Sequence, residues 1–250
     1  MNRLSTISQE SFYILNGMPS FVGLEQKKRI ETEVFSHLVD ELLSIGLSNN
    51  LNRVSVHLKK DSIVFFNHAA HLEERGFELF TTSVEYYKSF SEDFELKTDF
   101  SYFTLEDSRF TETEFKSLWG RVMQGSGNAN STLSMDEHLI SVKHELGSGW
   151  MRNCGVFYKD KVPVAVCIPH IEPGTEDEGR LFYFGVLPEE RGKGYAGILH
   201  KLSLKLLKEL GASYYVGSTH ETNTAMQRIF QKSGCEERGR RASYYYYFDK

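Results

Sequence analysis

Three glycines and two basic residues between Arg191 and Gly197 form the part of this sequence best suited to chemistry. The glycines occupy positions 192, 194 and 197, and Arg191 and Lys193 stand beside them. Glycine lets the backbone turn so that successive N–H groups converge, which is a common way to bind phosphate oxygens. The two cationic side chains add positive charge to the same concave surface. The segment therefore predicts a binding loop for a phosphate-containing ligand.

The residues on either side of this loop predict a strand before it and a helix after it. The run Leu181–Leu187 is apolar and aromatic, as is typical of a strand, and Pro188 follows it. After the loop, apolar residues recur at helical spacing until Gly211, where we expect the helix to end. These residues are Ile198, Leu199, Leu202, Leu206 and Leu210. A helix that begins at the loop directs its N-terminal N–H groups toward a bound phosphate.

The same glycines also fit a dinucleotide-binding fingerprint. The string Gly192-x-Gly194-x-x-Gly197 has the required spacing, and Glu221 lies 24 residues beyond it, near the place of a ribose-binding acid. That fingerprint requires a parallel strand–helix–strand unit. Here Arg152–Tyr158, Val162–Ile168 and Leu181–Leu187 are strand-like and joined by loops, which predicts an antiparallel meander. The dinucleotide interpretation is therefore the weaker of the two.

The strand, proline and glycine loop together resemble the signature of the GCN5-related N-acetyltransferase (GNAT) family, in which Arg/Gln-x-x-Gly-x-Gly/Ala opens a helix. The matching residues are Val186, Pro188, Arg191, Gly192, Gly194 and Ala196. The resemblance continues through Asn223-x-x-Met226 and Gly234-Cys235, where that family has an asparagine before the next helix and a closing glycine–aromatic pair. It implies the fold class α/β (α+β), with a GNAT-like mixed, mainly antiparallel central sheet flanked by helices.

This resemblance also implies acetyl-CoA as the cosubstrate, with an acetyl group transferred to a primary amine by direct attack. In the family's mode of binding, the backbone of the strand before the loop pairs with the pantetheine arm, in the slot of a splayed sheet. The loop holds the pyrophosphate, and Asn223 contacts the coenzyme arm. The residues expected to bind the coenzyme are Phe184, Gly185, Val186, Arg191, Gly192, Lys193, Gly194, Tyr195, Ala196, Asn223 and Phe230.

Direct attack requires removal of a proton from the amine and stabilisation of negative charge on the thioester oxygen. The resemblance assigns the second task to the backbone N–H of Val186. His220 and Glu221 follow a short β-rich segment and could accept the amine proton at the mouth of the slot. Many family members protonate the departing thiolate with a tyrosine, and Phe230 occupies that position here. The alternative is a non-catalytic coenzyme-A-binding or regulatory protein on the same fold.

The residues before this segment predict a smaller α/β unit, so the expected domains are 1–95 and 96–250. Its expected elements are helices to about Leu47 and at Ile63–Arg75, and strands at Arg53–Leu58 and Phe77–Tyr87. The order of these elements repeats that of the carboxy-terminal elements, so the unit is either a degenerate GNAT-like half-copy or an unrelated α/β unit. The polar segment Ser91–Asp99 is the expected linker.

Composition limits the class of partner and the compartment. A formal net charge of -5, with acids and bases interspersed, does not supply the positive surface that nucleic-acid binding needs. The start has no apolar signal segment, and no later run reaches the length of a membrane span, so we expect a cytoplasmic protein without membrane association. The expected partner is a small-molecule or peptide amine. The oligomeric state is open, and a homodimer is one of the options.

Histidines and acids elsewhere give weaker signals. His68 and His71 share one face of a predicted helix, but no third ligand is evident near them, so no metal is expected. His170 and Glu172 belong to the long connection between two predicted strands, and we expect both to face solvent.

Overall fold

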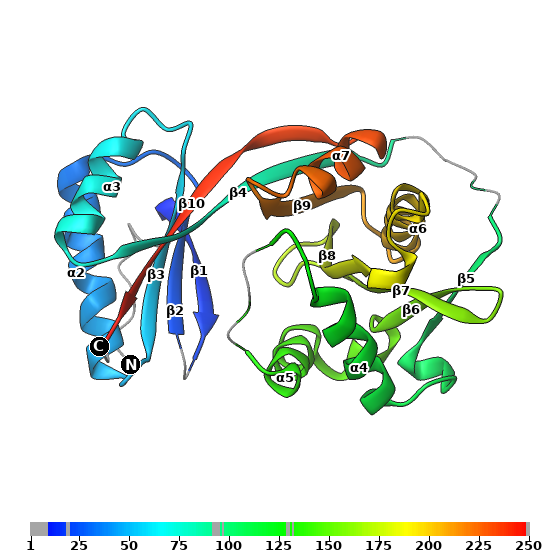
Figure 1. The fold of residues 1–250 in the computed structure, drawn as a ribbon. Helices are drawn as coiled ribbons and strands as arrows, with labels where there is room; N and C mark the ends of the chain where they lie inside the picture. Colours follow the sequence, from blue (N-terminus) through cyan, green and yellow to red (C-terminus); the bar gives the residue numbers. More distant parts are fainter. Residues whose placement is uncertain are drawn as a thin grey trace. The chain divides into compact units, whose positions relative to one another are not determined.

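The computed structural model describes residues 10–18, 21–91, 96, 98–128, 131 and 133–248. The chain divides into two compact units. The first unit runs to Val84 and includes the chain from Gly239 onward, and the second unit is Glu85–Arg238. Two long strands, β4 (Glu78–Ser89) and β10 (Glu236–Tyr247), have residues in both units (Figure 1). Among the described residues, no helix combines the length and the apolar character that a membrane span requires.

The second unit is built on an antiparallel meander. Its first strands are β5 (Phe100–Thr104), β6 (Gly155–Lys159), β7 (Val162–Ile171) and β8 (Glu178–Val186). Each pairs antiparallel with the next in this order. β6 and β7 are joined by Asp160 and Lys161, whose φ angles of 49° and 67° are typical of a two-residue hairpin turn. The meander predicted from the sequence is confirmed, and with it a mainly antiparallel sheet.

Helices cover both faces of this meander (Figure 1). They are α4 (Glu112–Met123), α5 (Met135–Leu146), α6 (Tyr195–Glu209) and α7 (Thr224–Lys232), with short 3₁₀ helices at Leu105–Asp107, Gly147–Arg152 and Pro188–Glu190. Alternate residues of β7 point to opposite faces. Val166 and Ile168 pack with α4 and α5, whereas Ala165 and Cys167 pack with α6. The sequence does not predict α5, because this helix buries few of its residues.

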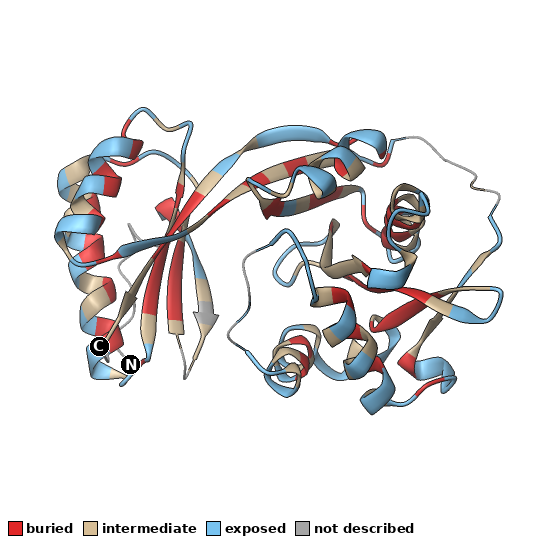
Figure 2. Cartoon of the chain, in the orientation of Figure 1, coloured by how far each residue is buried: buried red, intermediate tan, exposed pale blue. Residues whose placement is uncertain are grey.

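The first unit packs two helices on a second group of strands. The elements are β1 (Phe12–Gly17), β2 (Phe21–Gln26), α2 (Thr32–Ser48), β3 (Arg53–Lys59) and α3 (Phe65–Glu74). The buried residues lie on the strands and on the helix faces turned toward them (Figure 2). His68 of α3 is fully buried and stacks on Phe35 of α2, with 4.1 Å between the ring centroids. The predicted helices and β3 are confirmed, and β1 and β2 are additional.

Most of the carboxy-terminal strand β10 belongs to the first unit, whereas the sequence predicts it in the second domain. Residues Arg241–Tyr247 of β10 pair antiparallel with β3, and β2 pairs parallel with the other edge of β3. The sequence predicts these residues to be part of the domain 96–250. It gives no sign of their pairing with β3, because the pairing of strands from distant parts of a chain leaves no local pattern. The predicted linker Ser91–Asp99 falls in part on residues 92–95 and 97, which are outside the described residues.

Candidate active site

β8 and β9 (Tyr214–His220) are parallel neighbours that part after a short contact. Their pairing covers two residues of β8, Glu178 and Gly179, whereas β8 stays paired with β7 as far as Val186. We call the region beyond Gly179 the fork (Figure 1). In the fork, the edge of β8 that faces β9 is no longer paired with β9. An extended ligand can pair with such an edge as an added strand.

The backbone N–H of Val186 points toward the fork. The next N–H, that of Leu187, donates to the carbonyl oxygen of Val164 on β7 at 2.9 Å. Because successive N–H groups of a strand point to opposite edges, the N–H groups of Val186 and Phe184 are directed away from β7. The donor that the sequence analysis assigns to the thioester oxygen therefore lies on the free edge of β8.

The glycine loop before α6 is open. The φ angles are 79° at Gly192 and 81° at Gly194, in the left-handed region that glycine adopts readily. A methyl group added at either residue, or at Gly197, would meet nothing within 4 Å apart from its chain neighbours. Beside them, exposed Lys193 pairs with Glu190 at 2.9 Å, and this hydrogen bond raises the pKa of the lysine. The surface of the loop therefore has free space above its glycines and carries the cationic side chain of Lys193.

The N-terminus of α6 completes this open surface. Gly194 is the N-cap, no side chain caps the helix, and its first turn carries no acidic residue. The first N–H groups of a helix have no partner within it, and together with the helix dipole they favour a bound anion. The ring of Tyr195 packs edge-on against Phe100, 5.2 Å away, and Ala196 packs against the same core. These two residues thus offer their backbone to a ligand.

The guanidinium group of Arg191 donates hydrogen bonds to backbone carbonyls of the protein. Its Nε donates to the carbonyl oxygen of Val186 at 3.1 Å, and one terminal nitrogen donates to the carbonyl oxygen of Val122 at 2.9 Å. The other terminal nitrogen donates to the carbonyl oxygen of Gly125 at 3.4 Å. The guanidinium therefore joins the end of β8 to the end of α4. The sequence predicts that Arg191 binds phosphate, whereas in the structure its side chain donates to main-chain carbonyls.

The side chains of β8 pack on either side of the free edge. Phe184 lies edge-on to the imidazole of His200 on α6, with 5.4 Å between the ring centroids. A Cβ atom at Gly185 would lie 3.1 Å from the Cβ of Val122 on α4, closer than ordinary contact. Glycine therefore allows α4 to approach β8 at the level of the fork.

Asn223 belongs to a cluster of polar groups at the end of β9. Its Oδ1 accepts the N–H of Met226, as predicted for an N-cap, and its Nδ2 donates to Thr219 at 2.9 Å and Asn128 at 3.2 Å. The Oδ1 of Asn128 also accepts from the Thr219 hydroxyl at 2.7 Å and from the N–H of His220 at 3.1 Å. Asn128 follows α4 in the chain, and no motif in the sequence marks it. It fixes the polar end of β9.

His220 and Glu221 lie where β9 ends, before α7. Because β8 and β9 are parallel, this is the same end of the sheet as Val186. The Nδ1 of His220 accepts the N–H of Thr222 at 3.2 Å and lies 2.7 Å from the hydroxyl oxygen of the same residue. The backbone carbonyl of Glu221 accepts from Gln227 at 2.7 Å. The structure brings these residues to the carboxyl end of the fork.

Phe230, which the sequence predicts to bind the coenzyme, is buried in the structure. Only 1% of it is exposed. Its ring packs against Tyr86, His200 and Tyr215, with centroid distances of 4.8, 5.3 and 6.3 Å. Burial lowers the pKa of His200 to about 3, so its imidazole is neutral. Phe230 therefore belongs to an aromatic core beneath α7.

One protein-family model matches the part of the chain that contains these residues. Residues 125–235 match the model described as the acetyltransferase (GNAT) family. This match covers the glycine loop, the fork and the Asn223 cluster, so this part of the chain is a GNAT acetyltransferase domain. It confirms the resemblance predicted from the sequence.

Solved structures show the same fold. The GCN5-related N-acetyltransferase from Sphaerobacter thermophilus has 15% identity and a TM-score of 0.60, with 94% of this chain and 75% of that chain covered. That from Kribbella flavida has 12% identity and a TM-score of 0.62, with 94% and 90% covered. A tandem GNAT protein from the clavulanic acid biosynthesis pathway has 11% identity and a TM-score of 0.61, with 93% and 76% covered. No curated protein matches the chain.

Proposed function

We propose that this protein transfers an acetyl group from acetyl-CoA to a primary amine of a small molecule or peptide. One observation carries the proposal: the free edge of β8, with the N–H of Val186 at its end, leads directly into the open glycine loop of α6. An extended thioester arm and a diphosphate are joined in the same order in the coenzyme. The GNAT family match supports the general class of reaction.

The described residues fit the coenzyme at two places. The backbone N–H groups from Gly192 to Ala196 form a concave surface with no side chain over the glycines, which suits a pyrophosphate. The N–H groups of Phe184 and Val186 suit the amide and carbonyl groups of an extended arm. When bound, acetyl-CoA supplies the activated acetyl group. Lys193 adds charge for the phosphates, whereas Arg191 holds β8 and α4 around the site.

Chemistry then depends on a few groups at the carboxyl end of the fork. The N–H of Val186 stabilises the negative charge that develops on the thioester oxygen. His220 or Glu221, at the carboxyl end of β9, accepts the proton of the attacking amine. Phe230 has no hydroxyl and is buried, so the departing thiolate takes its proton from solvent or from another side chain.

A second function is favoured by Phe230 alone. A protein that binds coenzyme A for a regulatory purpose needs the loop and the fork, but it needs no proton donor for the thiolate. The absence of a hydroxyl at this position fits such a protein.

Turnover separates the two functions. The full chain is incubated with acetyl-CoA and a panel of primary amines, and released thiol is measured with a thiol reagent. We expect at least one amine to raise thiol release above hydrolysis, and His220→Gln together with Glu221→Gln to lower that rate without changing coenzyme A affinity. Coenzyme A binding with no amine-dependent release would favour the regulatory protein. No binding of coenzyme A would refute both functions.

A further inference from the structure

Three side chains of the second unit meet at the opposite end of β8 from Val186. Glu145 is near the end of α5, His170 is near the end of β7, and Glu172 begins the connection from β7 to β8. His170 pairs with Arg180 of β8, and the six residues from there to Val186 span about 20 Å. This cluster therefore lies well away from the fork.

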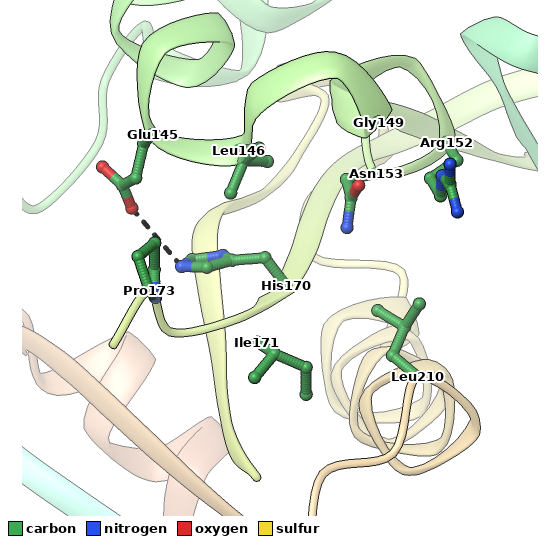
Figure 3. A pocket seen from close by; sticks show the side chains of 9 residues that line it. All are labelled: Glu145, Leu146, Gly149, Arg152, Asn153, His170, Ile171, Pro173 and Leu210. Atoms are coloured by element: carbon green, nitrogen blue, oxygen red, sulfur yellow. Dashed lines mark ion pairs between the residues drawn. The ribbon is translucent and has the colours of Figure 1, made fainter. Parts of the chain in front are cut away.

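The histidine of this cluster is buried, contrary to the prediction from the sequence. His170 is 3% exposed, because β7 continues beyond its predicted end and carries the residue into the sheet. Its Nδ1 is buried without a hydrogen-bond partner among the described residues. Its Nε2 is directed at the two carboxylates, and Figure 3 shows the ring and the Glu145 carboxylate turned toward each other. A buried imidazole thus faces a pair of acids.

The two distances from the histidine to the carboxylates match those between the ligands of one metal ion. His170 Nε2 lies 3.4 Å from an oxygen of Glu145 and 3.4 Å from an oxygen of Glu172, and the three atoms lie within 4.8 Å of one another. A good N–H···O hydrogen bond spans about 2.7–3.2 Å. Tetrahedral Zn²⁺ with bonds of about 2.0–2.1 Å holds its ligand atoms about 3.3–3.4 Å apart. The histidine is therefore at the separation that a shared ion would set.

The charge and the surroundings also fit a divalent cation. Arg180 pairs with Glu172 at 3.4 Å and with Glu178 at 2.6 Å, so this one arginine faces two of the three acids around the imidazole. Glu145 and His170 line a cavity of about 390 Å³, which leaves room for a water as the fourth ligand.

The backbone of Glu172 is held in place by hydrogen bonds within the connection and to β8. Its backbone N–H donates to the carbonyl oxygen of Glu178 at 2.8 Å, and its carbonyl oxygen accepts the N–H and hydroxyl of Thr175 at 3.0 and 2.8 Å. These bonds hold the start of the connection against β8. Preorganised ligands lower the cost of binding an ion.

The geometry points to a divalent transition-metal site formed by Glu145, His170 and Glu172, with Zn²⁺ the best-fitting ion. It joins the end of α5 to the end of β7 and the connection that follows, which are 25 residues or more apart in the sequence. An ion there fastens α5 to the sheet. This inference is independent of the acetyltransferase reaction.

Metal binding to the chelator-treated full chain tests this site. Zn²⁺ is titrated into wild type, Glu145→Gln, Glu172→Gln and Glu176→Gln, and affinity is measured by competition with a coloured indicator. Glu176 is an exposed acid of the same connection and is the matched control. We expect a single tight ion in wild type and in Glu176→Gln, and affinity lowered ~10-fold or more in the other two variants. Wild type without tight binding, or with affinity unchanged by both ligand variants, overturns the site.

Two further readings separate the site from a simple ion-pair cluster. Zn²⁺ should raise the thermal midpoint of wild type but not that of Glu145→Gln. Each protein is compared with its own metal-free form, so a loss of ion pairing that lowers both midpoints of the variant does not affect the comparison. Co²⁺ bound in place of Zn²⁺ should give the strong visible absorption of tetrahedral coordination, and this absorption should be lost in Glu145→Gln. The weak absorption of octahedral Co²⁺ in wild type would refute the tetrahedral site.

Discussion

Replacing Gly194 by alanine should separate coenzyme binding from folding. The residue has a φ of 81°, and an added methyl group would meet nothing within 4 Å beyond its chain neighbours. The cost to the folded state is therefore the left-handed backbone penalty, roughly 1–2 kcal/mol. Gly211→Ala is the matched control, because Gly211 has a φ of 102°, has the same free space and follows the other end of α6. Both variants should lose a comparable free energy of unfolding.

Coenzyme A should distinguish the two variants. The methyl group of Gly194→Ala projects from the loop surface that we assign to the pyrophosphate. A hydrogen bond to a charged group contributes about 1.5–3 kcal/mol, so loss of one weakens binding by about 10-fold to 150-fold. At about 100 times its dissociation constant, coenzyme A adds about 2.7 kcal/mol to the stability of wild type. A 100-fold weaker complex gains only about 0.4 kcal/mol at the same concentration.

Urea unfolding of the three proteins, with and without coenzyme A, measures these differences. We expect the full gain in wild type and Gly211→Ala, and most of it lost in Gly194→Ala. Equal gains in both variants would refute the assignment of the loop to the pyrophosphate. Stabilisation by NAD and not by coenzyme A would restore the dinucleotide interpretation.

Three other changes test separate parts of the structure. Arg191→Met removes the hydrogen bonds to the carbonyls of β8 and α4 and should lower the free energy of unfolding by about 1–3 kcal/mol. Lys193→Met changes an exposed side chain and should leave that free energy nearly unchanged, and equal effects of the two variants in urea would contradict the bridging role. Burial lowers the pKa of His68 to about 4 from 6.5, so the unfolded chain binds the extra proton between these values. The contribution of His68 to stability should therefore be constant above about pH 6.5 and fall by up to about 3 kcal/mol toward pH 4, so stability should fall less in His68→Leu than in wild type; an unchanged slope would show that His68 does not contribute. Phe230→Tyr buries a hydroxyl in the aromatic core and should cost about 1–3 kcal/mol without raising amine-dependent thiol release, and a faster release would show that this position reaches the thiolate.

The sequence determined the local features of the carboxy-terminal domain. Glycine spacing, a preceding proline and helical periodicity depend on neighbouring residues, so the loop at Gly192–Gly197, the start of α6 and the N-cap at Asn223 were readable without a structure. The hairpin at Asp160 was equally local. These features were sufficient for the family resemblance that the match over residues 125–235 confirms.

Only the tertiary structure decided where side chains point and where strands part. The pairing of β8 with β9 ends after Gly179 because of how distant segments pack, and no residue of either strand encodes that end by itself. Packing likewise turned Arg191 toward carbonyls, brought Asn128 to the end of β9 and buried His170 between two acids. These contacts join residues far apart in the chain, and a sequence pattern carries information mainly about residues that are near one another.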